Sequence, residues 1–90
     1  MAVSRAERRE LRRASVAAVI GDDEVGAALD LLELVELAWH DCYGEITPSD
    51  AVVDDMLVLS EGTLAGLVVA ARLAVTDWRD LRIAADALRS

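Results

Sequence analysis

The chain is short of several residue types, and each shortage narrows what the protein can be. Its one cysteine, Cys42, has no partner for an intramolecular disulfide, which suits a reducing compartment, so we expect a cytoplasmic protein. All nine cations are arginines; with the abundance of Ala, Val, Leu and Asp, this indicates a bacterial, GC-rich coding bias. Phenylalanine is absent and aromatic residues are only 3%, so the apolar share of 54% consists mostly of small aliphatic side chains.

Long apolar runs are missing as well. The most apolar segment, residues 64–75, is interrupted by Arg72 and falls far short of the ~20 residues that a membrane span needs. The segment Arg5–Arg13 is charged where a signal peptide would have its apolar core. Ninety residues fit one domain, and we therefore expect residues 1–90 to form a single soluble domain.

Positive charge is absent from most of the chain. Residues 14–71 hold twelve acids and no cation, whereas the segment Arg5–Arg13 holds five arginines beside two glutamates. The net charge of −8 argues against nucleic-acid binding as the main role, because phosphates attract cation-rich surfaces. We favour the protein's own acidic middle as the counterpart of the arginine segment.

Helix start and stop signals recur along the chain and predict an all-α bundle of four helices. The capping-box spacing of Ser4 and Glu7 begins a first helix over about residues 5–20, which Gly21 would end in a left-handed conformation. A second helix over about residues 24–43 follows after so short a joint that the two are expected to form an antiparallel hairpin.

The second helix is the expected centre of the bundle. Its polar positions form one narrow stripe, and apolar side chains cover the rest of its circumference. The stripe consists of Asp30, Glu33, Glu36 and His40, and we expect it to face solvent. We expect Trp39, and also Trp78 near the C-terminus, to be core anchors, and Cys42 on the apolar side to be an inert core residue.

A short third helix is expected from Pro48 to about Leu59. Thr47 suits the N-cap position before it, and Pro48 suits the first helical position. Ser60 would then cap the fourth helix.

Whether residues 61–89 form one helix or two depends on Thr76 and Asp77, which could cap a new helix. Polar residues recur at spacings of three and four across this point without a jump, which favours one continuous helix. Such a helix is about 42 Å long and would extend beyond a compact body of 90 residues, so its free end would need a partner. Small residues fall four apart along it, at Gly62, Gly66, Ala70 and Ala74. The row suits close packing against the second helix or, as the alternative, a dimer seam.

These features favour a non-catalytic protein–protein interaction or structural module that self-associates as a homodimer. A small domain cannot easily bury so large an apolar share by itself. The expected contact residues lie on the last helix and in the small-residue row: Arg72, Trp78, Arg79, Arg82, Gly62, Gly66 and Ala70. We find no motif for a catalytic residue or a cofactor.

Two alternatives remain open from the sequence. Glu36, His40 and Asp54 could hold a metal or another ligand and support an enzyme, although the i, i+4 spacing and the single histidine favour a solvated stripe. The second alternative is a regulator that contacts nucleic acid or an acidic partner through the segment Arg5–Arg13.

Overall fold

The computed structural model describes residues 3–90, and these form five α-helices, one short 3₁₀ helix and no strand. In chain order, the elements are α1 (Arg5–Ala17), η1 (Asp22–Glu24), α2 (Val25–Tyr43), α3 (Asp50–Ser60), α4 (Leu64–Thr76) and α5 (Trp78–Arg89). The predicted all-α class is confirmed, with one helix more than the sequence suggested.

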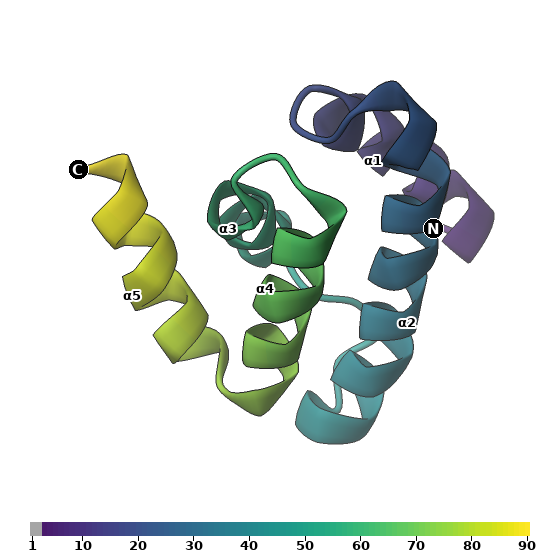
Figure 1. The fold of residues 1–90 in the computed structure, drawn as a ribbon. Helices are drawn as coiled ribbons and strands as arrows, with labels where there is room; N and C mark the ends of the chain where they lie inside the picture. The colour runs from purple at the N-terminus through teal and green to yellow at the C-terminus, as the bar shows by residue number, and fades with distance from the viewer. Residues whose placement is uncertain (1–2) are drawn as a thin grey trace.

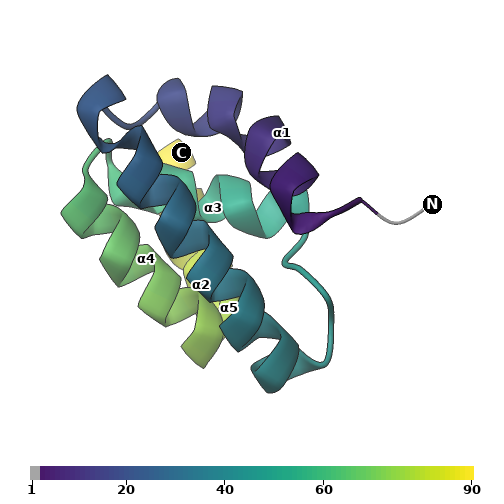
Figure 2. The same ribbon diagram turned by 90° about the vertical axis from the view of Figure 1, so that its right-hand side faces the viewer.

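The helices α2 and α4 run side by side through the middle of the molecule, with α1 packed on α2 and α5 packed on α4 (Figure 1). α3 contacts both α4 and α5 from behind. From the side, α1 folds back across α2 (Figure 2). Val16 is the only buried residue of α1, so this helix has the smallest share in the apolar core.

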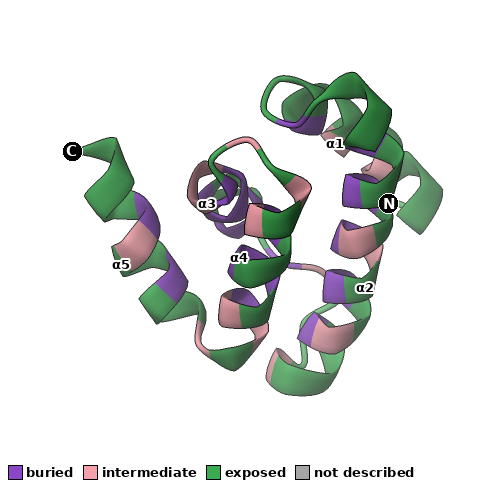
Figure 3. Cartoon of the chain, viewed as in Figure 1, coloured by how far each residue is buried: buried purple, intermediate pink, exposed green. Residues whose placement is uncertain are grey.

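The core lies where the inward faces of the helices meet (Figure 3). Its most deeply buried large apolar side chains are Val16, Ile20, Leu29, Leu32, Met56, Leu67 and Leu81. Trp39 is buried, as expected, and its ring lies 4.3 Å from that of Tyr43 between centroids. The Tyr43 hydroxyl donates a hydrogen bond to the carbonyl of Ala74 at 2.9 Å, which joins the last turn of α2 to α4.

The structure corrects the prediction of one long C-terminal helix. α4 ends at Thr76, Asp77 has extended backbone angles (φ −160°, ψ 104°), and α5 begins at Trp78. The Asp77 side chain accepts a hydrogen bond from the backbone N–H of Arg79 at 3.0 Å, so it caps α5. Because α5 turns back to pack on α3 and α4, the described residues have no overhanging C-terminal helix that would need a partner.

The ends of α1 and α2 agree only in part with the ends predicted from the sequence. Ser4 caps α1 as predicted, but the helix ends at Ala17, and Gly21 has φ −59°, outside the left-handed region. Gly44 does end α2 in the left-handed conformation, with φ 73°. Cys42 is exposed rather than in the core, because it lies at the margin of the buried face in the last turn of α2.

The N-caps of α3 and α4 each lie a few residues beyond the predicted ones. Ser49, not Thr47, caps α3 and accepts a hydrogen bond from the backbone N–H of Val52. Thr63 caps α4 instead of Ser60. Ser60 is buried and forms the last residue of α3, so a short turn is needed before α4 can begin.

Candidate functional site

A buried carboxylate is the most distinctive polar feature of the fold. The side chain of Glu36 is 4% exposed, so this residue does not belong to the solvent-facing stripe predicted for α2. Arg8 of α1 binds both carboxylate oxygens, from Nε at 3.0 Å and from a terminal nitrogen at 2.9 Å. Arg12 donates a further hydrogen bond to Oε1 at 2.9 Å. We name Glu36, Arg8 and Arg12 the Glu36 cluster.

The Glu36 cluster also reaches the loop between α2 and α3. The second terminal nitrogen of Arg12 donates to the Thr47 hydroxyl at 2.9 Å and to the Pro48 carbonyl at 3.3 Å. The Thr47 hydroxyl therefore accepts a hydrogen bond from Arg12 of the Glu36 cluster and does not cap α3. Three segments that are distant in sequence meet at one network of charged hydrogen bonds, which fixes α1 on the body.

The environment of Glu36 keeps it ionised. Burial on its own raises the pKa of a carboxyl group. Here the hydrogen bonds and charge of Arg8, together with the charges of Arg12 and Arg5, outweigh burial, and the pKa of Glu36 lies below its ordinary value. The cluster is thus an ion-paired network near neutral pH, with its carboxylate already occupied by guanidinium groups.

Two further arginines of the segment, Arg9 and Arg13, are also paired with carboxylates. Arg9 contacts Asp30 at 2.7 Å and Glu33 at 3.1 Å on α2. Arg13 contacts Glu10 on its own helix at 3.1 Å. Counting the Glu36 cluster, three of the five arginines bind the acidic face of α2, which is the counterpart that the charge pattern favoured.

A second buried carboxylate, Asp55, lies between α3 and α5. The side chain of Asp55 on α3 is 3% exposed, and a terminal nitrogen of Arg89 lies 2.8 Å from its Oδ1. The Nε of Arg82 lies 3.9 Å from Oδ2. These contacts hold the last helix against α3, so Arg82 and Arg89 contribute to the fold of the chain itself.

The structure does not assemble the metal or ligand site that the sequence allowed. Glu36 is bound by two arginines, and His40 is exposed on the outer side of α2. Asp54 is exposed on α3 and borders a different hollow from the one that Glu36 and His40 line. Across residues 3–90, no three His, Cys, Asp or Glu side chains converge as metal ligands would.

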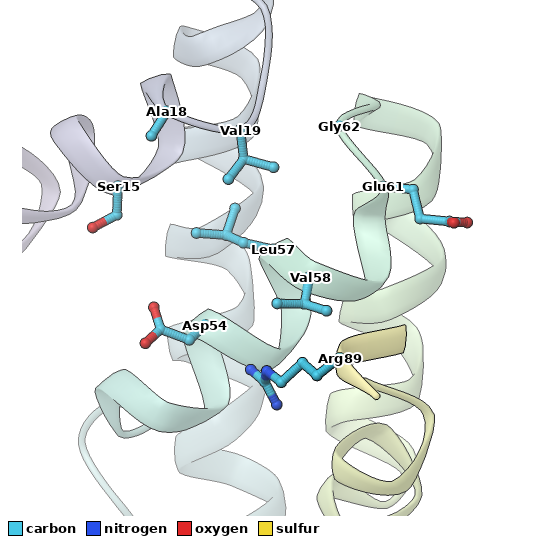
Figure 4. Close-up of a pocket in the computed structure, with 9 residues that line it drawn as sticks. All are labelled: Ser15, Ala18, Val19, Asp54, Leu57, Val58, Glu61, Gly62 and Arg89. Atoms are coloured by element: carbon cyan, nitrogen blue, oxygen red, sulfur yellow. The ribbon is translucent and has the colours of Figure 1, made fainter. Parts of the chain in front are cut away.

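Two hollows on the described surface are candidate sites. The larger, about 590 Å³, lies between the end of α1, α3 and the end of α5 (Figure 4). Its lining combines apolar Val19, Leu57 and Val58 with Asp54 and Arg89. The smaller, about 260 Å³, lies beside the Glu36 cluster. Both are open to solvent, and neither holds a nucleophile beside a base as a catalytic site would.

The outer face of α4 is the least polar exposed helix face. At 3.6 residues per turn, its exposed residues fall on one side of the helix: Ala65, Val68, Val69, Arg72 and Thr76. Val69 is 62% exposed and Val68 is 43% exposed. Of the five α-helices in residues 3–90, only α4 carries no acidic residue. We name these five residues the α4 face.

The predicted contact residues separate into exposed and internal groups. Arg72, Trp78, Arg79 and Arg82 are exposed, although Arg79 lies against Asp77 and Arg82 faces Asp55. The row of small residues is not an exposed seam. Gly62 lies in the turn before α4, Gly66 is half-buried and Ala70 is fully buried. Ala70 therefore packs inside the chain and is not available as a surface contact, whereas Gly62 and Gly66 are partly exposed.

Two groups of residues escaped the sequence analysis. Burial of Glu36 and Asp55 depends on which neighbouring helices cover them, and helical spacing does not contain that information. A usable signal was the match between arginines four apart at positions 8 and 12 and the acidic positions of the next helix. The α4 face had a plain signal too, since residues 62–76 contain no acid.

Comparison with known proteins yields no match: no family model, curated protein or solved structure is significantly similar to the chain. Within residues 3–90, none of the helices has the length and apolar character that crossing a bilayer demands. Function must therefore be argued from the geometry alone.

Proposed function

We propose that the protein is a non-catalytic interaction module that self-associates through the α4 face. The observation that supports this proposal is the exposure of two adjacent valines, Val68 and Val69, on a helix face that carries no acidic residue. Large apolar side chains on a surface are favourable partners once they are removed from water. The same helix buries Leu67, Ala70 and Ala74 on its other side, so packing against the rest of the chain holds α4 in place without a partner.

Charge limits where a second copy of the chain could bind. Each copy carries a net charge of −8, so two copies repel each other wherever their acidic faces approach. The α4 face avoids this repulsion and offers Arg72 as its only charge. Other exposed apolar residues lack this advantage: Leu34 and Leu37 lie on α2 among acidic neighbours.

The expected strength of the association is modest. α4 has 13 residues and is about 20 Å long, so an interface centred on it lies at the small end of the range for specific interfaces. We expect a dissociation constant of about 1 μM, with monomer and dimer exchanging freely.

Sedimentation velocity over a wide range of protein concentrations tests the proposal. Val69→Asp should raise the dimer dissociation constant about tenfold or more, because each contact would then bury an unpaired carboxylate. Leu34→Asp is the matched control, since Leu34 on α2 has the same 62% exposure and lies on the proposed free surface. A wild-type chain that stays monomeric throughout, or equal effects of both substitutions, would contradict the proposal.

A further inference from the structure

The larger surface hollow lies where two helices end, and we name it the α1–α3 hollow. Val19, just after α1, and Gly62, just after α3, line it, and a Cβ on Gly62 would lie 3.3 Å from the Val19 carbonyl oxygen. The C-terminal end of a helix carries a partial negative charge, because its last carbonyl groups have no intrahelical partner. Neither α1 nor α3 has a basic residue in its last turn that would offset this charge.

Two carboxylates add to the negative charge at the α1–α3 hollow. Asp54 and Glu61 line it and are exposed, and no cation of residues 3–90 lies within ion-pair distance of either. Arg89 also lines the hollow, but its guanidinium group lies 2.8 Å from both Asp55 and Asp86, which compensate its charge. The hollow therefore keeps an excess of negative charge and suits a cationic partner.

The floor between the two carboxylates is apolar. Leu57 and Val58 lie between Asp54 and Glu61 along α3, and Val19 faces them from the end of α1 (Figure 4). Asp54 and Glu61 are seven positions apart, which is about 10 Å along the helix. A partner that fits the hollow must therefore bring two cations about that far apart, with an apolar group between them.

We infer that the α1–α3 hollow binds a basic amphipathic segment of another protein, with an apolar side chain on the floor and one cation toward each carboxylate. A helix has the required spacing when arginines at positions i and i+7 flank apolar residues at i+3 and i+4, because all four then lie on one face. The inference goes beyond the proposed self-association, since the hollow and the α4 face share no residue.

A small organic cation fits the hollow less well than a protein segment. Sites for small molecules bury most of the surface of the ligand, whereas this hollow is open to solvent. None of its described lining residues is aromatic, so it offers no cage for an ammonium group. An open apolar floor with a carboxylate at each end instead matches a segment that lies along α3 and covers the floor with one face.

A labelled peptide tests the inference. The probe is a fluorescein-labelled, alanine-based helix with arginines at i and i+7 and leucines at i+3 and i+4, and fluorescence anisotropy at low salt measures its affinity for the full chain. Replacing both arginines by glutamine should weaken binding about tenfold, and replacing both leucines by alanine should do the same, because both kinds of contact contribute. Equal binding of the leucine-free peptide would show general attraction to an acidic chain and overturn the inference.

Val58→Arg should block the hollow from within the chain. The new guanidinium group comes four residues after Asp54 and three before Glu61, so it can pair with both carboxylates and cover the floor. We expect it to weaken binding of the probe about tenfold or more. Leu34→Arg is the matched control, because it adds the same charge at an exposed position of α2 and should leave the affinity nearly unchanged. Equal losses for the two variants would overturn the inference.

Neutral substitutions measure the contribution of the carboxylates. Asp54→Asn and Glu61→Asn should each weaken binding of the probe about threefold, and together about tenfold, as expected for exposed ion pairs. Asparagine suits position 61 because it tolerates the left-handed conformation found there, with φ 52°. Asp41→Asn on α2 is the control for the loss of one exposed charge and should have little effect. A double variant that binds as well as wild type would overturn the inference.

Amide chemical shifts locate the probe on the wild-type chain. The changes should concentrate at the end of α1 and in the second half of α3. Changes centred on α2 or α4, or displacement of the probe by an equal concentration of spermidine, would overturn the inference. Circular dichroism of each variant should match wild type, which confirms that the fold is intact. A chain that stays monomeric but binds the probe as described would overturn the proposed function alone and support this inference.

Discussion

Replacing Glu36 by Gln removes the one negative charge that Arg8 and Arg12 share. The substitution keeps the size of the side chain and one acceptor oxygen, so cavity formation contributes little. What changes is that two guanidinium groups, 17% and 11% exposed, lose their counter-ion. A buried charge left without a partner loses solvation without gaining a compensating contact.

The size of the effect follows from this burial. Breaking a buried pair from one side costs about 3–5 kcal/mol. The remaining exposure of Arg8 and Arg12 lets water reach them in part, so we expect a loss of about 3 kcal/mol in the free energy of unfolding. The free energy of unfolding of a chain of this length is about 5–13 kcal/mol, so the expected loss is a substantial part of its stability.

Urea unfolding followed by circular dichroism measures the loss directly. Glu33→Gln is the matched control, because its partner Arg9 keeps a second carboxylate, Asp30, and Glu33 is one-third exposed. Hydrogen exchange gives a local readout: amides of α1 should lose protection first, since Val16 is the only buried residue of that helix. A loss for Glu36→Gln below about 1 kcal/mol, no larger than for the control, would refute the view that the buried ion pairs hold α1 in place.

The same cluster predicts a dependence on pH. The pKa of Glu36 is lower in the folded chain than its ordinary value, so ionised Glu36 stabilises the fold above about pH 4.3. That contribution is lost as the pH falls through the depressed value in the folded state. The difference in unfolding free energy between wild type and Glu36→Gln should therefore shrink on acidification. A difference independent of pH would show that the charge of Glu36 does not matter.

The remaining predictions concern helix packing and capping. Gly66→Ala should destabilise the chain despite the better helix propensity of alanine, because the new Cβ would overlap the carbonyl of Ser60. Gly26→Ala has open space around it and should instead stabilise the chain by about 0.5–1 kcal/mol. Thermal unfolding of the two variants distinguishes these effects. Thr63→Ala removes the acceptor of the Gly66 N–H at 2.9 Å and should cost about 1 kcal/mol in urea unfolding, whereas Thr63→Ser should restore most of it.

Helix existence could be predicted from this sequence, but the break at Asp77 could not. The polar stripe continues in phase across residues 76 and 77, and this continuity predicts a single helix. The stripe identifies the solvent side of each helix, and both α4 and α5 have one. A single extended residue is enough to turn the chain, and the capping oxygen of Asp77 stabilises the new helix start. Cap chemistry was therefore the more reliable of the two signals.

The polar positions of α2 show a second limit of periodicity. Asp30, Glu33, Glu36 and His40 do share a stripe, yet Glu36 is buried and His40 is exposed. Spacing places residues on one side of a helix but does not show what covers them. Arg8 and Arg12 cover Glu36 because α1 folds back across this part of α2. The expectation that the arginines pair with the acidic middle was correct because it used charge on both segments.

The proposal of self-association rests on different features in the structure than in the sequence. The sequence suggested an overhanging helix and a seam of small residues; the structure folds α5 back on the body and buries Ala70. The net charge of the chain still limits where two copies could meet. Copies that each carry −8 can approach closely only where acids are absent, and α4 is the described helix that meets this condition. In the proposed dimer, its exposed valines would supply the attraction.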